Sequence, residues 1–302
     1  MQRQKSFSNN KSTLFLVATP IGNLSDITYR AVETLKSVDY IFAEDTRVSK
    51  TLLMHYDIKT PLDSYHEYNK EEKGNKILEL LDKGSNVALI SDAGMPIISD
   101  PGYSVSRCAI DQGYNVVIIP GVSASLSALV VSGINPHPFL FYGFLSNKVQ
   151  ARRKELELLK DKKETLIFYE TPHRIEEFLH DALNILGDRK MALCRELTKK
   201  FEEIIRGNIS EVIEILPEIK GEMVLVIEGS NETNDYSNLT VIEHVNLYIK
   251  EGKTTMDAIK LVAKDRNVKK QEIYDIYHGK EWLLWKNIIW PLQSHMHQEH
   301  LI

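Results

Sequence analysis

The sequence predicts an α/β protein with two consecutive α/β domains and a small helical C-terminal unit. Its 302 residues exceed the usual size of a single domain. In the first half, short apolar runs alternate with helical stretches, as they do around a parallel sheet. Gly, Asn and two Pro interrupt this pattern at residues 133–138, and a second α/β pattern follows. We therefore expect one α/β domain at 12–132 and another at 133–230.

The first domain is expected to contain four strands, each followed by a distinctive loop. The strands are predicted at Thr13–Ala18, Tyr40–Ala43, Asn86–Ile90 and Asn115–Ile119. The helices are predicted near Ile27–Leu35, Lys73–Lys83, Gly102–Gln112 and Ser123–Ser132. Ser25 or Asp26 is placed to cap the first of these helices.

The second domain and the C-terminal unit follow the same reasoning. Strands are predicted at Phe139–Leu145, Thr165–Tyr169, Met191–Cys194 and Met223–Ile227, with helices at Gln150–Lys160 and Arg174–Leu186. The unit at 231–279 begins with a polar linker, and helices are predicted at Val241–Lys250 and Thr255–Ala263, with Thr255 as N-cap, and after Lys269–Lys270.

Both ends of the chain fall outside this pattern. Residues 1–11 are polar and are expected to form a disordered tail. Residues 280–302 hold all three tryptophans in a tail of unknown role. The helical spacing of Trp282 and Trp285 favours packing on the body or on a dimer partner over stacking on RNA.

The composition limits the class of protein. The chain is 43% hydrophobic and 26% charged, which is ordinary for a globular protein, and it lacks the roughly 20-residue apolar run of a membrane span. We expect a cytoplasmic enzyme. Cys108 and Cys194 have no nearby thiol or His at metal-ligand spacing, so we expect reduced core residues and no metal. A net charge of -5 argues against binding of naked nucleic acid by charge alone.

The loop Ser91–Gly102 is the most informative segment. It directly follows the apolar run at 87–90 and contains two Gly, two Pro and the carboxylates of Asp92 and Asp100. Open α/β sheets bind ligands at the carboxyl ends of their strands. Acidic side chains there suit a cationic or hydroxyl-bearing ligand, whereas a phosphate would require backbone N–H groups and basic side chains.

Three further loops are expected to meet this one in a single crevice. They are Thr19–Asp26, Glu44–Arg47 and Pro120–Ser125. The first has one Gly, so neither a dinucleotide fingerprint nor a Walker loop fits it. In the second domain, Glu170–Arg174 repeats the passage from strand to loop to helix and adds a carboxylate, an imidazole and a guanidinium.

These segments carry a resemblance to a known family. The motifs are Val17–Leu24, Ala43–Arg47, Ser91–Gly102, Pro120–Gly121, Glu170–Arg174 and Arg195–Lys199. They resemble ribosomal RNA small subunit methyltransferase I, which belongs to the tetrapyrrole methylase superfamily. The resemblance implies S-adenosylmethionine as donor, bound in a crevice between the two α/β domains. It also implies 2′-O-methylation of a cytidine in the decoding region of 16S rRNA by a cytoplasmic homodimer that does not contact a membrane.

The resemblance and the chemistry of the donor together give the candidate site residues. The sulfonium, ammonium and ribose diol of the donor suit carboxylates and backbone carbonyls. The cofactor-binding candidates are Pro20, Gly22, Asp92, Gly94, Met95, Ile98, Asp100, Gly121 and Ser123, with Met95 standing where the family usually has Thr. The catalytic candidates, as acceptors of the 2′-OH proton, are Glu170, Glu44 and Asp45. The RNA-binding candidates are Arg47, His66, Glu67, Arg152, Arg153, His173, Arg174 and Lys199.

Two alternatives remain open at this point. A tetrapyrrole methylase acting on a small molecule would use the same crevice, but such enzymes resemble Gly-x-Gly-Pro-Gly-Asp where this chain has Thr19–Asn23. A non-catalytic ribosome-assembly factor that binds S-adenosylmethionine would also fit the motifs. Labelling of assembled subunits, naked rRNA or uroporphyrinogen by the donor would separate these functions.

Overall fold

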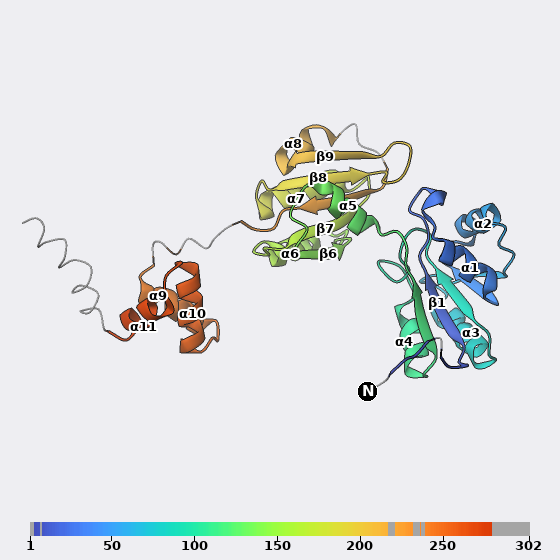
Figure 1. Cartoon of the computed structure of the whole chain (residues 1–302). Helices are drawn as coiled ribbons and strands as arrows, with labels where there is room; N and C mark the ends of the chain where they lie inside the picture. The colour runs from blue at the N-terminus through green and yellow to red at the C-terminus, as the bar shows by residue number, and fades with distance from the viewer. Residues whose placement is uncertain (1–2, 7, 217–220, 232–235, 237–238, 280–302) are drawn as a thin grey trace, which may run out of the picture. The chain divides into compact units, whose positions relative to one another are not determined.

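The computed structural model describes residues 3–6, 8–216, 221–231, 236 and 239–279 (Figure 1). The chain divides into two compact units, and the second begins at Asn231. The tail at 280–302, with its three tryptophans, lies outside the described residues. Within the described part, no helix is both long and apolar enough to span a membrane.

The first unit contains two five-stranded sheets, and the predicted α/β class is confirmed. The first sheet is parallel throughout, with the order β3-β2-β4-β1-β5. Its strands are β1 (Thr13–Val17), β2 (Tyr40–Ala43), β3 (Leu62–Ser64), β4 (Val87–Ile90) and β5 (Asn115–Ile119). All four residues of the central strand β4 are buried, as expected for a parallel sheet covered on both faces.

Four helices cover the first sheet. They are α1 (Tyr29–Ser37), α2 (Thr46–His55), α3 (Lys70–Asp82) and α4 (Tyr103–Asp111). Leu35 of α1 and Leu53 of α2 share a hydrophobic cluster with Ile41, on one face. Ile77 of α3 and the neighbouring helix α4 share another cluster with Phe42, on the opposite face. Because successive side chains of a strand alternate between faces, Ile41 and Phe42 pack in the hydrophobic clusters on opposite faces of the sheet.

The second sheet is mixed, with the order β6-β7-β10-β8-β9. Its strands are β6 (Phe139–Gly143), β7 (Thr165–Glu170), β8 (Lys190–Arg195), β9 (Glu203–Asn208) and β10 (Met223–Ile227). One face packs against α6 (Val149–Leu159), α7 (Ile175–Leu186) and α8 (Ile209–Glu214). The other face packs against α5 (Ala124–Ser132), whose Ala128 and Leu129 contact the strands. The sequence pattern instead predicts this helix as the last element of the first domain, which ends at residue 132.

The C-terminal unit is a three-helix cluster. It consists of α9 (Val241–Lys250), α10 (Thr255–Asp265) and α11 (Lys270–Tyr277), around a core that includes Val245, Ile259 and Ile273. The predicted cap at Thr255 is wrong, because the Thr254 side chain accepts the hydrogen bond from the backbone N–H of Asp257.

The first helix is also capped by a different residue from the one predicted. α1 begins at Tyr29, and the side chain of Thr28 accepts a hydrogen bond from the backbone N–H of Ala31. Ser25 and Asp26 instead belong to a short 3-10 helix, Leu24–Asp26, which Asn23 caps. The loop after β1 is therefore longer than predicted.

The N-terminal segment, which the sequence pattern predicts to be disordered, makes hydrogen bonds at the edge of the first sheet. The side-chain amide of Gln4 both donates to the Val116 carbonyl (2.9 Å) and accepts from the Val116 N–H (3.1 Å). The Asn9 side chain exchanges hydrogen bonds with that of Asn115. Gln4 therefore occupies backbone groups that the edge strand β5 would otherwise leave open.

Candidate functional site

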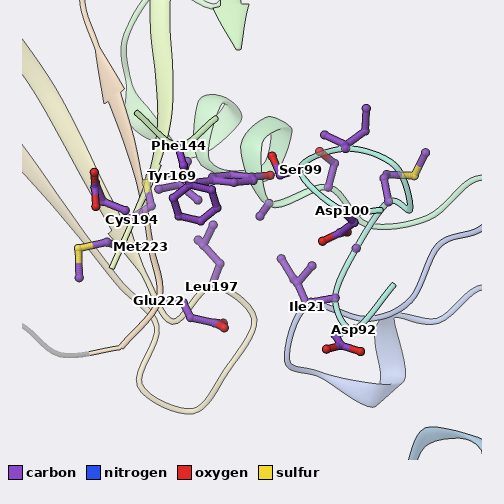
Figure 2. Close-up of a pocket in the computed structure, with 18 of the residues that line it drawn as sticks. Ile21, Asp92, Ser99, Asp100, Phe144, Tyr169, Cys194, Leu197, Glu222 and Met223 are labelled. Carbon is purple, nitrogen blue, oxygen red and sulfur yellow. The ribbon is translucent and has the colours of Figure 1, made fainter. Parts of the chain in front are cut away.

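A cavity of about 380 Å³ lies between the carboxyl edge of the first sheet and the second sheet (Figure 2). All four predicted loops contribute to it, and so do the ends of β7, β8 and β10. We call it the first cavity. Its lining residues include Ile21, Glu44, Asp92, Gly94, Met95, Ile98, Asp100, Ser123, Phe144, Tyr169, Glu170, Cys194, Glu196, Leu197, Lys199, Glu222 and Met223.

The loop after β4 is fixed to the loop after β1 by an antiparallel bridge. Thr19 and Gly94 exchange backbone hydrogen bonds of 2.9 and 3.0 Å. The Ser91 hydroxyl donates to the Gly94 carbonyl at 3.1 Å. Ile97 and Ser99 have φ angles of 77° and 67°, a left-handed conformation that is strained for residues other than glycine. Strained backbone of this kind concentrates at ligand-binding loops, and here it forms a wall of the cavity.

Three carboxyl groups from the loops of the first sheet make that side of the first cavity acidic. Burial and the nearby Glu44 and Asp92 raise the pKa of Asp100 to about 7. Burial also raises the pKa of Glu44 and of Asp92, and in each case a neighbouring carboxylate adds to the rise. Asp92 is held in place by a 2.9 Å hydrogen bond from the Asp45 backbone N–H. Because each negative charge disfavours the others, a cation in this cavity would relieve their repulsion.

The opposite wall of the first cavity contains aromatic and apolar side chains, with Glu170, Glu196, Glu222 and Lys199 beside them. Phe144 and Tyr169 pack edge to face with ring centroids 5.5 Å apart, and Leu197 lies beside them (Figure 2). Burial raises the pKa of Cys194 to about 11, so its thiol stays protonated. Sequence reasoning missed this wall, because apolar residues at strand ends have the same pattern as core residues. One cavity thus joins an acidic side to an aromatic side.

The three catalytic candidates have different environments. Glu44 lines the first cavity and has a raised pKa. Asp45 instead caps α2, and its ion pair with Arg47 (2.6 Å) and hydrogen bond from the Arg47 N–H (2.8 Å) lower its pKa to about 2. The side chain of Glu170 is completely buried, and it accepts from Arg174 and from the Thr171 N–H, each at 3.1 Å.

The predicted cofactor-binding residues fall into three groups. Six of them line the first cavity: Asp92, Gly94, Met95, Ile98, Asp100 and Ser123. Pro20 and Gly22 line a neighbouring second cavity. Gly121 instead packs on Ala18, so closely that a Cβ at this position would lie 2.8 Å from the Ala18 Cβ. Gly121 therefore serves backbone packing beside the crevice.

The prediction that Arg152 contacts RNA is wrong. Only 2% of its side chain is exposed, and it pairs with Asp181 (2.8 Å) and Glu177 (3.1 Å). A guanidinium in this position is inaccessible to an RNA phosphate and instead joins α6 to α7. Arg153, the next residue, has a side chain that is 59% exposed and pairs with the same Asp181 at 2.7 Å. Adjacent residues of a helix point in different directions, which separates a buried role from a surface role.

Four more RNA candidates lie outside the lining of both cavities, on α2 and on the loops after β3 and β7. Arg47 has an 89% exposed side chain, and His173 is exposed on the loop after β7. His66 follows β3 and is held by Asn69, whose side chain accepts from the His66 backbone N–H (2.8 Å). Glu67 forms an exposed ion pair with Lys70.

Two further candidates, Arg174 and Lys199, are held by protein partners. Arg174 donates to the Leu145 carbonyl at 2.8 Å, in addition to its pair with Glu170. The Nζ of Lys199 lies 3.1 Å from Glu196 and 2.9 Å from Glu222. Both side chains therefore support the walls of the site.

The second cavity, of about 420 Å³, lies on the α2 side of the loop after β1. It shares part of its wall with the first cavity through Ile21, Asp92, Ala93 and Lys199. Its other lining residues are Thr19, Pro20, Gly22, Leu24, Val48, Thr51 and Leu52. Among the described residues, no group of three or more His, Cys, Asp or Glu side chains could hold a metal ion.

Comparison with known proteins assigns the fold and its chemistry. Residues 13–213 match the family described as Tetrapyrrole (Corrin/Porphyrin) Methylases. The chain belongs to this family. Members of the family are methyltransferases that use S-adenosylmethionine, and the expected cofactor is thereby confirmed. A solved cobalt precorrin-4 methyltransferase of cobalamin biosynthesis shares the fold, with a TM-score of 0.55 at 17% identity over 71% of this chain and 94% of its own.

Two relatives specify the branch of the family. The ribosomal RNA small subunit methyltransferase I of Bacillus subtilis (strain 168) is 55% identical over 93% of this chain and 100% of its own length. The protein of the same name from Halalkalibacterium halodurans is 49% identical over 92% of this chain and 99% of its own. Within the tetrapyrrole methylases, this chain is therefore a member of the ribosomal RNA small subunit methyltransferase I family, as the motifs predict.

Proposed function

We propose that this protein transfers a methyl group from S-adenosylmethionine to the ribose 2′-oxygen of a cytidine in the decoding region of 16S rRNA. The donor site is inferred from the first cavity, where three carboxyl groups lie opposite an aromatic wall. The names of the relatives support small-subunit rRNA as the substrate. The finer choice of a cytidine ribose rests on the resemblance of the sequence motifs.

The first cavity fits the donor chemically. Asp92 and Asp100 would face the positive charges, since a carboxylate is the natural partner of an ammonium group. Phe144 and Tyr169 would pack against the adenine, and the strained loop would supply backbone groups close to the ligand. S-adenosylmethionine, when bound, supplies the methyl group on a sulfonium centre. The protein's own task is to align the two reactants and to exclude water.

Methylation of a hydroxyl group releases a proton, and Glu44 is the acceptor that we propose. Its pKa is raised and it lines the cavity, so its carboxylate is both basic and close to bound ligands. Asp45 is a weaker base because its pKa is about 2 and its oxygens are occupied by Arg47. Glu170 would act as a positioning residue that holds Arg174.

RNA contact would come from exposed groups around this crevice. We propose Arg47, Arg153 and His173, together with His66 and Glu67 on the loop after β3. Phosphate contacts from the arginines would give salt-dependent affinity and set the register of the RNA. We further propose a homodimer and a cytoplasmic location, where small ribosomal subunits are present.

The proposed function is tested by offering labelled donor with three acceptors in parallel. These are assembled small subunits from cells that lack the enzyme, naked 16S rRNA and uroporphyrinogen. We expect label in the rRNA of the assembled subunits. Label in uroporphyrinogen would favour a small-molecule methylase instead. Binding of the donor with no transfer to any acceptor would favour a non-catalytic assembly factor.

A further inference from the structure

The second cavity is a preformed site that the donor does not account for. At about 420 Å³ it is as large as the first cavity, and it falls within the range of roughly 300–1,000 Å³ that small-molecule sites occupy. Leu24, Val48 and Leu52 give it apolar walls. Thr19 and Thr51 add hydroxyl groups. This combination suits a flat heterocycle with a polar edge.

The walls of the second cavity are held in place by contacts within the protein. The Tyr56 hydroxyl, at the end of α2, donates to the Leu24 carbonyl at 2.5 Å and fixes the loop after β1 to this helix. The Lys199 side chain lies across Gly22, where an added Cβ would be 2.5 Å from the Lys199 Cγ. Glu196 and Glu222 hold the ammonium group of this lysine. Lys199 therefore closes one side of the cavity.

The position of the second cavity relates it to the first. Ile21, Asp92 and Ala93 line both cavities, so the two cavities adjoin at these residues and their ligands would lie next to each other. A methyl transferase needs its acceptor next to its donor, with the two reacting atoms aligned. Asp92, in this wall, is electrostatically coupled to Glu44, the proposed proton acceptor.

Charge at the rim favours a phosphorylated ligand. Arg47 lies in the first turn of α2, one turn before Thr51, so the two residues share one side of the helix. Its side chain is 89% exposed and is held at the N-terminal end of α2 by its ion pair with Asp45, so a phosphate would share the guanidinium with this carboxylate. A backbone phosphate outside the cavity would meet this guanidinium while the attached nucleoside lies inside.

We propose that the second cavity receives the acceptor nucleoside, unstacked from the RNA, between the loop after β1 and α2. Enzymes that do chemistry on a base take the nucleotide out of its stack and hold the base between aromatic or apolar side chains, and the same placement would present the ribose of an unstacked nucleotide here. Leu24, Val48 and Leu52 would hold the pyrimidine, and the ribose would lie where the two cavities adjoin, beside Asp92. The proposal rests on the proposed function and adds to it the place where the acceptor binds.

The test fills the second cavity from α2. Val48 is 49% exposed and lines the second cavity, so Val48→Trp places an indole in the space without disturbing the core. Thr51→Phe, one turn further, fills the same space from another position. The matched control is Met54→Trp, at a 71% exposed position of the same helix. Donor Kd is measured by calorimetry, and kcat and KM are measured with unmethylated small subunits.

We expect both filling variants to raise the KM for subunits by about tenfold or more, because the added ring occupies the space of the nucleoside, and to leave the donor Kd unchanged. Met54→Trp should behave as the wild type. Wild-type kinetics in both filling variants would overturn the inference, and so would an equal loss of donor affinity, which would assign the cavity to the donor. Failure of the wild-type protein to methylate subunits would refute the proposed function instead.

Discussion

Replacement of Asp100 by Asn removes a negative charge from the first cavity and preserves its shape. Its pKa rises from an ordinary 3.8 to about 7 in the folded protein. This rise corresponds to about 4 kcal/mol of unfavourable interaction for the ionised form. Because the side chain is partly accessible to water, we expect about 1–3 kcal/mol of it to appear in stability.

The sign of the pH dependence follows from proton binding. Between about pH 4 and pH 7, folded Asp100 binds more proton than unfolded Asp100, so wild-type stability falls as the pH rises through this window. In Asp100→Asn this fall in stability is absent, because the amide does not ionise. Without donor, the variant should be more stable than the wild type at about pH 8 and equally stable at about pH 4, as measured by denaturant unfolding.

Donor binding should change in the opposite direction. A cation favours the ionised carboxylate, so Asp100→Asn should weaken donor binding by about 1.5–3 kcal/mol at about pH 8, or about 10- to 150-fold. The difference should shrink at about pH 5.5, where wild-type Asp100 is mostly protonated before the donor binds. Calorimetry at the two pH values measures both effects.

The exposed Asp161→Asn serves as the control for the Asp100 variant, because it removes a surface carboxylate outside both cavities. It should leave donor affinity and its pH dependence unchanged. A folded Asp100→Asn protein with wild-type donor affinity at both pH values would refute the assignment of the acidic wall to the donor.

Three further predictions follow from packing and charge. Arg152→Ala should destabilise the protein by about 3 kcal/mol or more, because it removes a partner of the buried Asp181 carboxylate. Arg153→Ala, at an exposed side chain, should destabilise it by less than about 1 kcal/mol, and urea unfolding measures both values. Gly121→Val should lower Tm as well as donor affinity, since its side chain would collide with Ala18, and an unchanged Tm would contradict this. Removal of residues 231–302 should leave calorimetric donor affinity intact and reduce subunit methylation, and loss of donor binding by the folded remainder would contradict it.

The sequence predicts well those elements whose burial leaves a local pattern. The strands at 40–43 and 115–119 have the predicted bounds, because apolar residues flanked by turn residues mark them. β3 and β9 were missed because a three-residue strand and an edge strand with exposed polar residues lack this signal. The helix α2 was missed because its charged start was assigned to a binding loop.

The sequence predicts site residues that directly follow a strand. It does not predict the role of a residue whose partner lies far away in the sequence. Asp92 and Asp100 could be placed in a ligand loop, because carboxylates and glycines directly after a buried strand are uncommon. The buried role of Arg152 could not be predicted, since its partner Asp181 is 29 positions away and arginines are usually exposed. The aromatic wall at Tyr169 had the same local pattern as a core strand.

The central claim is methyl transfer to the ribose of a cytidine in small-subunit rRNA. The most direct measurement incubates the protein with labelled S-adenosylmethionine and small subunits from cells lacking it, digests the rRNA to nucleosides and separates them by chromatography. The account predicts label that comigrates with 2′-O-methylcytidine and approaches one methyl group per subunit. Label in a base-methylated nucleoside, or no label in rRNA from a protein that binds the donor, would contradict it.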